Sequence, residues 1–229
     1  MKKILIMAIA LLVCGALQAQ DNGVQREKKS FLALHAGPSI PVGDFGSNNT
    51  ANQDAAFAKT GYTIDMNYGY LFDKNAGITA TAFFNNYNTH PFVMTFNGEG
   101  GSQNIELKMD HWKFYGIAAG PMLTYEVGKN VNTDIKVMGG IVEVNSPKIL
   151  YNNIIMAEQD WAWAPILQGG LSLRIGTGSN VFVFGNADYL YMKPKFHYSY
   201  TDMNDQLVTE DTRQKITAVN VSAGIGIKF

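Results

Sequence analysis

Cysteine is almost missing from this chain of 229 residues, since it occurs only once, as Cys14. The first nineteen residues, MKKILIMAIALLVCGALQA, contain two lysines, an apolar run from Ile4 to Val13 and small residues up to Ala19. This order is typical of a secretory signal peptide, so we expect residues 1–19 to be removed after export. The mature chain is then predicted to have no disulfide, no reactive thiol and no cysteine metal site.

Two other interpretations of this leader stay open. A single transmembrane helix would need ~20 apolar residues, which is longer than the run present here. A lipoprotein signal would keep and acylate Cys14, although Val13 is bulkier than that cleavage usually tolerates. Residues 20–29 are polar and charged, and we expect them to form a periplasmic lead-in to the folded domain.

Long apolar runs are missing after the leader, which excludes helical membrane spans from the mature chain. An excess of positive charge is missing too. Removing Lys2 and Lys3 from eighteen basic residues leaves sixteen against nineteen acidic ones, a formal net charge near −3. This mild acidity argues against nucleic acid as a partner. The remaining ~210 residues favour one domain over two.

What the chain does have is alternation with a period of two, most cleanly in residues 216–229. Counting back from Phe229, every second residue is apolar as far as Val219, and the residues between are mostly small or polar. A period of two is the mark of a β-strand, and ~10 tilted residues cross the hydrocarbon layer of a bilayer. We interpret this stretch as the closing strand of an outer-membrane β-barrel.

Seven earlier segments alternate in the same way. Together they predict an all-β fold, an eight-stranded antiparallel up-and-down transmembrane β-barrel over residues 30–229. The seventh strand is the least regular, because Phe182 and Phe184 fall on the face that is expected to point inward. The expected strands are 30–40, 60–72, 77–88, 111–127, 133–144, 161–175, 181–197 and 216–229.

The connections between these strands alternate in length, which predicts the orientation of the barrel. Outer-membrane barrels have short periplasmic turns and longer extracellular loops, so both termini are expected in the periplasm. The short turns are 73–76, 128–132 and 176–180, and the long polar loops are 42–59, 89–110, 145–160 and 199–215.

Aromatic residues are expected at two levels of the outer wall, because amphipathic rings prefer the two membrane interfaces. The alternative is that these rings are core residues of a soluble β-protein, such as a lipocalin-like barrel. The predicted interface aromatics are Tyr68, Tyr70, Phe72 and Tyr125 at the periplasmic side, Trp112, Trp161 and Trp163 at the outer edge, and Tyr189 and Tyr191 on the seventh strand.

Charged residues of both signs alternate toward the inside of the predicted barrel. An eight-stranded barrel is wide enough only to be filled with side chains or to hold something small. We therefore favour a plugged, hydrogen-bonded lumen with an ion-paired floor, and the alternative is a narrow ion pathway or a switchable gate. The predicted lumen residues are His35, Asp65, Glu126, Asp134, Lys136, Arg174, Asp188 and Lys228.

Catalytic and cofactor motifs are missing from the sequence. It contains no G-x-S-x-G elbow, no H-E-x-x-H helix and no phosphate-binding loop, and its four histidines lack metal-ligand spacing. We therefore expect no cofactor, no metal and no catalytic residue. A weaker alternative is a lipid-modifying enzyme that uses His197 and Ser199 at the rim.

The segment FLALHAGPSIPVGDF at the first strand, the Gly- and Tyr-rich meander and the terminal GIGIKF resemble the outer-membrane protein β-barrel domain family, similar in plan to the small OmpA- and OmpX-like barrels. The resemblance implies that the barrel-assembly machinery recognises Phe229 during insertion. It implies a monomeric, non-enzymatic protein in outer-membrane lipid, whose loops serve adhesion, envelope integrity or recognition of a partner that the sequence does not identify. A small passive channel is the alternative function.

Overall fold

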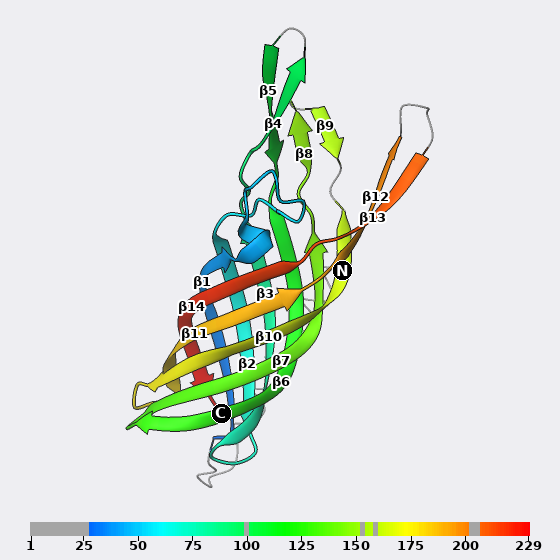
Figure 1. Ribbon diagram of the computed structural model, residues 1–229. Helices are drawn as coiled ribbons and strands as arrows, with labels where there is room; N and C mark the ends of the chain where they lie inside the picture. Colours follow the sequence, from blue (N-terminus) through cyan, green and yellow to red (C-terminus); the bar gives the residue numbers. More distant parts are fainter. Residues whose placement is uncertain (1–27, 99–100, 152–153, 158–159, 202–206) are drawn as a thin grey trace.

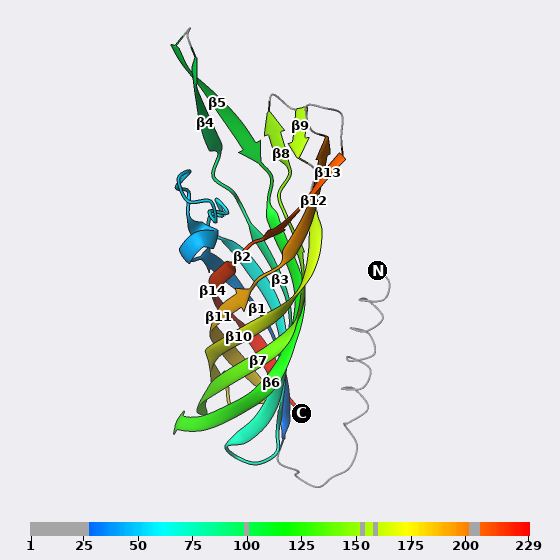
Figure 2. The same ribbon diagram turned by 45° about the vertical axis from the view of Figure 1, so that its right-hand side comes forward.

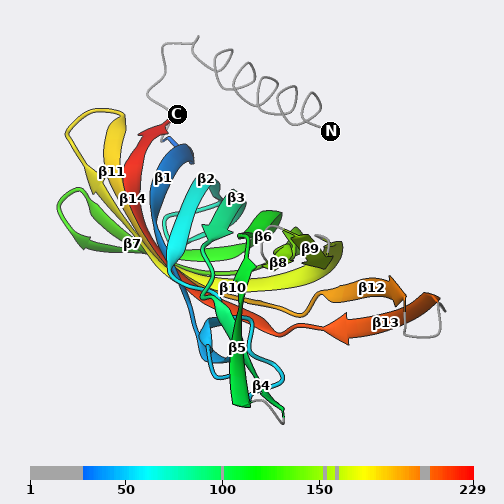
Figure 3. The same ribbon diagram turned by 90° about the horizontal axis from the view of Figure 1, so that it is seen from above.

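Eight long strands close into a barrel in the computed structural model (Figures 1 and 3), which describes residues 28–98, 101–151, 154–157, 160–201 and 207–229. The expected signal peptide lies outside these residues. The barrel strands are β1 (Ser30–Pro41), β2 (Gly61–Leu71), β3 (Ala76–Tyr87), β6 (Trp112–Gly128), β7 (Val131–Asn145), β10 (Trp161–Gly176), β11 (Val181–Met192) and β14 (Ile216–Lys228). Their order is β1-β14-β11-β10-β7-β6-β3-β2, with β2 pairing back to β1 and every pair antiparallel. The predicted fold class and strand number are confirmed.

The alternation of the sequence becomes the two faces of this barrel. Aliphatic side chains point outward and stay exposed, with Leu34 at 60%, Val137 at 55% and Ile225 at 66% of their surface. Their sequence neighbours point inward and are buried, as Ala33, Lys136 and Gly226 illustrate. Since no second layer formed by the described residues covers the outer wall, its apolar surface needs an apolar solvent.

Short turns join the strands at one end of the barrel, which we name the turn end. At residues 72–75, the Asp73 carboxylate accepts hydrogen bonds from the backbone N–H groups of Asn75 (2.7 Å) and Ala76 (2.8 Å). The other two turns use the left-handed backbone region, at Asn130 (φ 68°) and Gly178 (φ 85°). Asn and Gly tolerate this region better than other residues, so the turn chemistry fits the short connections.

The opposite end, the hairpin end, carries further strands beyond the barrel (Figures 1 and 2), which corrects the prediction of loops without strands. These further strands contain short runs of aromatic and β-branched residues, which favour the extended conformation within otherwise polar connections. The strands are β4 (Phe92–Gly98), β5 (Gly101–Met109), β8 (Ile149–Tyr151) and β9 (Ile154–Ala157) in one sheet of order β4-β5-β8-β9, and β12 (Lys195–Thr201) with β13 (Leu207–Arg213) in another. The predicted strand 181–197 is also corrected, since it is interrupted at Pro194, which has no N–H to donate.

The first long connection, residues 42–59, folds back over the hairpin end as a lid. It contains the 3-10 helix η2 (Gly43–Gly46), and Phe45 of this helix is fully buried. Backbone hydrogen bonds from Ala58 to Phe45 and from Phe57 to Ser47 tie the connection to itself. Within the described part of the chain, no helix is long and apolar enough to cross a membrane.

Candidate functional site in the barrel lumen and at its rim

The lumen is filled at its hairpin end by an apolar plug. The ring of Phe45, from the lid, lies 5.0 Å from the ring of Tyr87 and 5.7 Å from the ring of Phe114, measured between centroids. Trp112 also belongs to this plug, because its side chain is buried and its Nε1–H donates to the backbone oxygen of Ala56 (3.1 Å). The interface position predicted for Trp112 is therefore wrong, since the ring points into the barrel.

A smaller apolar layer fills the lumen toward the turn end. Phe182 and Phe184 point inward from β11 and pack with Phe31, Ala33 and Met122. The rings of Phe31 and Phe182 meet edge to face at 5.8 Å. The irregularity of the seventh predicted strand is thereby explained, because its two inward phenylalanines belong to this layer.

Buried charged and polar side chains lie beside the smaller apolar layer and between the two layers, and we name them the polar belt; it contains two ion pairs and one histidine–carboxylate pair. Arg174 of β10 binds Asp134 of β7 in a bidentate pair, with Nε and one terminal nitrogen at 2.8 and 2.7 Å from the carboxylate oxygens. Thr124 donates a third hydrogen bond to the same carboxylate (2.7 Å). The guanidinium carbon lies 4.4 Å from the ring centre of Phe31, so the pair lies beside the smaller apolar layer and packs against it.

The second ion pair joins Lys136 of β7 to Asp188 of β11, with 3.1 Å between Nζ and the nearer carboxylate oxygen. The side-chain amides of Gln168 (2.6 Å) and Asn186 (2.7 Å) donate to this oxygen as well. Two hydrogen bonds and one ion pair therefore converge on one oxygen of this buried carboxylate. Such convergence offsets the cost of removing the charges from water.

The third pair is His35 with Asp65, with 3.3 Å between Nδ1 and the carboxylate. Nδ1 also lies 2.8 Å from the hydroxyl of Ser222, and the imidazole ring packs 4.8 Å from the ring of Phe184. Thr63 donates to Asp65 (2.7 Å) and extends the belt toward Ser39, Asn85, Tyr87 and Asn220. Cross-strand neighbours His35 and Asp65 thus lie opposite each other, as their register requires.

The two remaining predicted lumen residues lie outside this belt. Lys228 is half-buried at the mouth of the turn end, with Nζ 5.9 Å from the ring centre of Phe182. Glu126 is exposed, which corrects its predicted place in the ion-paired floor. The reason is the length of β6, whose pairing with β3 ends at Leu123 and leaves Glu126 beyond the floor of the barrel.

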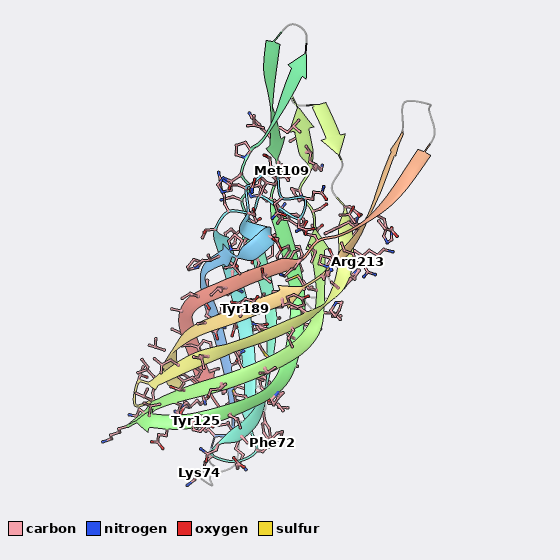
Figure 4. All side chains as sticks on the ribbon, viewed as in Figure 1. Phe72, Lys74, Met109, Tyr125, Tyr189 and Arg213 are labelled. Carbon is pink, nitrogen blue, oxygen red and sulfur yellow. The ribbon has the colours of Figure 1, made fainter. Side chains whose placement is uncertain are left out.

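The other predicted interface aromatics lie on the outer wall. Phe72 and Tyr125 lie at the turn end, and Tyr189 lies farther up the wall (Figure 4). Trp161 and Trp163, at 62% and 61%, are the most exposed of the aromatic side chains that the structure describes, and they lie where β10 begins at the hairpin end. Tyr68, Tyr70 and Tyr191 point outward with part of their surface buried.

Known proteins share this architecture rather than this sequence. No protein-family model and no curated protein matches the chain. Among solved structures it is similar to the outer membrane protein OprG from Pseudomonas aeruginosa, with a TM-score of 0.51 and 14% identity over 90% of this chain and 99% of OprG. Neisserial surface protein A gives 0.50 and 12% over 87% and 97%, and the outer membrane protease OmpT from Escherichia coli gives 0.50 and 8% over 92% and 99%.

The chain has the fold of the outer-membrane β-barrels. At these identities the likeness is one of fold, and it agrees with the eight closed strands and with the apolar outer wall. The sequence resemblance to small eight-stranded barrels is confirmed at this level.

The rim of the barrel carries a group of charged residues on the β12–β13 hairpin. Lys195 (2.6 Å) and His197 (2.5 Å) both contact the carboxylate of Asp211 on the facing strand. The hydrogen bond from Lys195, with a further one from His197, lowers the pKa of Asp211 below its ordinary value. The side chain of Ser199 lies outside the described residues. In the described ranges, no three His, Cys, Asp or Glu side chains gather in a way that could hold a metal ion.

Proposed function

We propose that this protein is a non-enzymatic integral outer-membrane barrel with a closed lumen, which acts at the cell surface through the hairpins at one end. The observation that carries this proposal is the filling of the lumen by two apolar layers and a belt of paired charges, while the strands continue beyond the barrel at the hairpin end. A filled lumen leaves no path for solutes, and projecting strands offer surface for contact.

The proposed orientation has the turn end and both termini in the periplasm. Short periplasmic turns and long extracellular connections are the rule in this class of barrel, which supports the orientation. Phe229 lies at the turn end, hydrogen-bonded to Ser30 through its backbone, where periplasmic assembly machinery would meet it. We also propose that residues 1–19 are removed and that Phe229 is an assembly signal. The mature protein is then a monomer surrounded by outer-membrane lipid.

Cell fractionation and gel mobility test the membrane assignment. A closed barrel resists detergent until it is heated, so we expect the protein in the outer-membrane fraction and a mobility that changes on boiling. A protein recovered from the soluble periplasm, with the same mobility before and after boiling, would point instead to a soluble lipocalin-like barrel.

The alternative function is a small passive pore, and the charged belt is the observation that favours it. Each of its carboxylates has a partner, however, because Asp65, Asp134 and Asp188 lie within 3.3 Å of an imidazole, a guanidinium and an ammonium group, respectively. Single-channel recording in planar bilayers separates the two functions. We expect no steady conductance from the purified protein, and steady single-channel steps would replace the closed lumen with a pore.

The third hypothesis is a hydrolytic or lipid-modifying enzyme, since OmpT is a protease and His197 pairs with a carboxylate at the rim. We assign the pair a structural role, because Lys195 shares the same carboxylate and all three side chains are about half exposed on facing strands. The test is His197→Ala, with Lys193→Ala as a control on the same wall. We expect the outer-membrane lipid profile and peptide cleavage to be the same in both variants, and a loss confined to His197→Ala would contradict the non-enzymatic assignment.

A further inference from the structure

The outer wall of the barrel is not uniformly convex, because a groove of about 660 Å³ is sunk into it between β1 and β7. Its floor consists of small outward-facing residues on three neighbouring strands, Ala80 and Ala82 of β3, Ala119 of β6 and Gly139 of β7. A Cβ atom built on Gly139 meets nothing within 4 Å, so the floor is open to the surroundings at this point. We name this feature the wall groove.

Bulky apolar side chains form the two sides of the wall groove. Leu32, Met66 and Tyr68 stand on one side, and Ile117 and Ile141 stand on the other. The first three are half-buried although they point outward, whereas Leu34 on the next outward position of β1 is 60% exposed. The groove is therefore deep enough to shield side chains that would otherwise face the membrane fully.

The wall groove runs obliquely from the turn end toward the middle of the wall. The groove follows the register row Leu32, Tyr68, Ala80, Ala119 and Gly139, in which each residue pairs directly with the next. Leu32 lies two positions from the start of β1, while Gly139 lies eight positions from the start of β7. Because barrel strands tilt, such a row climbs from one membrane interface into the hydrocarbon layer.

Polar and basic groups lie where the wall groove meets the turn end. The rings of Tyr68 and Phe229 are 6.5 Å apart there, and the Tyr68 hydroxyl lies 3.4 Å from the hydroxyl of Ser30. Lys28 and Lys29, which directly precede Ser30, are exposed. Hydroxyls and ammonium groups at an interface suit a phosphate ester, and an apolar channel that leads away from them suits a hydrocarbon chain.

We infer that the wall groove binds one phospholipid of the leaflet at the turn end, with an acyl chain along the small-residue floor and the phosphate near Tyr68, Ser30, Lys28 and Lys29. The groove is continuous with the lipid-facing wall, so lipid is the molecule that reaches it first. The inference rests on the proposed membrane location of the barrel, and the leaflet is the periplasmic one if the proposed orientation holds.

Native mass spectrometry of delipidated protein, with added palmitoyl-oleoyl phosphatidylethanolamine, tests the inference. The variant Gly139→Leu places a side chain in the groove from β7, and Ala80→Leu places one there from β3. The matched control is Ala187→Leu, an outward alanine of β11 whose cross-strand neighbours Leu171 and Val221 are exposed. We expect one retained lipid in the wild type and the control, and an affinity about tenfold weaker in both groove variants.

The headgroup is tested with palmitoyl-oleoyl glycerol, which has the same chains but no phosphate, and with Lys28→Ala/Lys29→Ala. We expect the double variant to weaken binding of the phospholipid but not of the diglyceride. Equal lipid retention by the groove variants and the control overturns the inference. A dimer that Gly139→Leu abolishes also overturns it, because a second copy of the chain would then occupy the groove. The heat-dependent mobility of each variant reports barrel closure separately, so a failure of the membrane assignment remains distinguishable.

Discussion

At the scale of single residues, the buried charges of the lumen depend most clearly on their partners. Arg174 supplies two of the three hydrogen bonds to the Asp134 carboxylate, and both side chains are almost fully buried. Removal of one member of such a pair leaves the other as an uncompensated charge away from water, which costs more than the pair itself contributes.

We therefore predict that Arg174→Met lowers the free energy of unfolding by about 3–5 kcal/mol, as breaking a buried pair does. Urea unfolding in lipid vesicles measures it. The double variant Arg174→Met/Asp134→Asn should recover most of the loss, since no buried charge is then left alone. The control is Lys129→Met in an exposed turn, and equal losses in Arg174→Met and Lys129→Met would contradict the prediction.

Asp73 gives a second prediction at this scale, through the turn between β2 and β3. Hydrogen bonds from the N–H groups of Asn75 and Ala76 lower the pKa of Asp73 below its ordinary value, and Lys29 adds to the effect. A lowered folded-state pKa means that the carboxylate stabilises the turn above the unfolded pKa of ~3.9 and loses this effect as pH falls through the folded pKa.

Carbon NMR of the Asp73 carboxyl group should accordingly show a midpoint below ~3.9, and a midpoint at or above that value would refute the assignment. Asp73→Asn keeps an oxygen acceptor without the charge. In the wild type, the protection factors of the Asn75 and Ala76 amide protons should fall when the solution is acidified through that range. In Asp73→Asn they should stay constant.

At the scale of elements, neighbouring barrel strands pack together where a phenylalanine ring on one strand lies over a glycine on the next. Phe31 covers Gly69, Phe83 covers Gly116 and Phe182 covers Gly226, and each phenylalanine pairs directly with its glycine across the strands. A Cβ atom added at any of the three glycines would lie 2.2 Å from a ring carbon. A ring laid over a glycine covers backbone that would otherwise be bare and pins the register.

The variant Gly116→Ala should therefore lower the free energy of unfolding by about 1–3 kcal/mol, the usual cost of overpacking. Gly139→Ala is the matched control, because its Cβ meets nothing within 4 Å. The same urea titration compares the two. If Gly116→Ala unfolds at the same urea concentration as Gly139→Ala, the ring does not lie on the glycine.

The sequence predicted the barrel strands well because one face of each meets lipid and the other meets a filled lumen, so the period of two survives along their length. Glu126 and Trp112 show the limit of that reasoning. Glu126 has inward parity but lies beyond the floor. Trp112 has inward parity and does point inward, under a lid that no periodicity predicts, so the interface prediction for Trp112 was wrong where its parity was right.

The hairpin strands were missed for a related reason. Outside the barrel neither face meets a membrane, so polar residues such as those of β13 (LVTEDTR) weaken the alternation. The ion pairs of the lumen were likewise predictable as a group but not as partners. Arg174 and Asp134 lie 40 positions apart and meet only because β10 and β7 are neighbours.

At the scale of the whole molecule, the barrel and the outer parts of the sheets above it are separable. The four-stranded and two-stranded sheets hydrogen-bond within themselves, whereas the lid of residues 42–59 and Phe196 of β12 pack into the plug of the lumen. Replacement of residues 92–109 and 198–210 by short turns, which keeps Phe196, should therefore leave a closed barrel that still changes mobility on boiling and still carries no current.

The informative comparison for this prediction is removal of the lid instead. Loss of residues 43–58 takes Phe45 out of the plug, so we expect lower heat resistance for this variant than for the barrel without hairpins. Binding of the protein to its extracellular partner should show the opposite ranking of the two variants. We expect this binding to be lost when the hairpins are removed and kept when the lid is removed. If both deletions behave alike, the hairpins and the lid do not have separate roles.

The seam of the barrel lies between β1 and β14, where Phe31 faces Lys228 across nearly the full length of the described chain. Every other barrel contact joins strands that are closer in sequence, so this seam is the pairing that costs most chain entropy to form. Until it forms, β1 and β14 are edge strands whose unpaired N–H and C=O groups can pair with strands of other polypeptides. Folding of this protein is thus most vulnerable to aggregation just before completion, and a factor that holds the two edge strands together would accelerate the final step more than any earlier one.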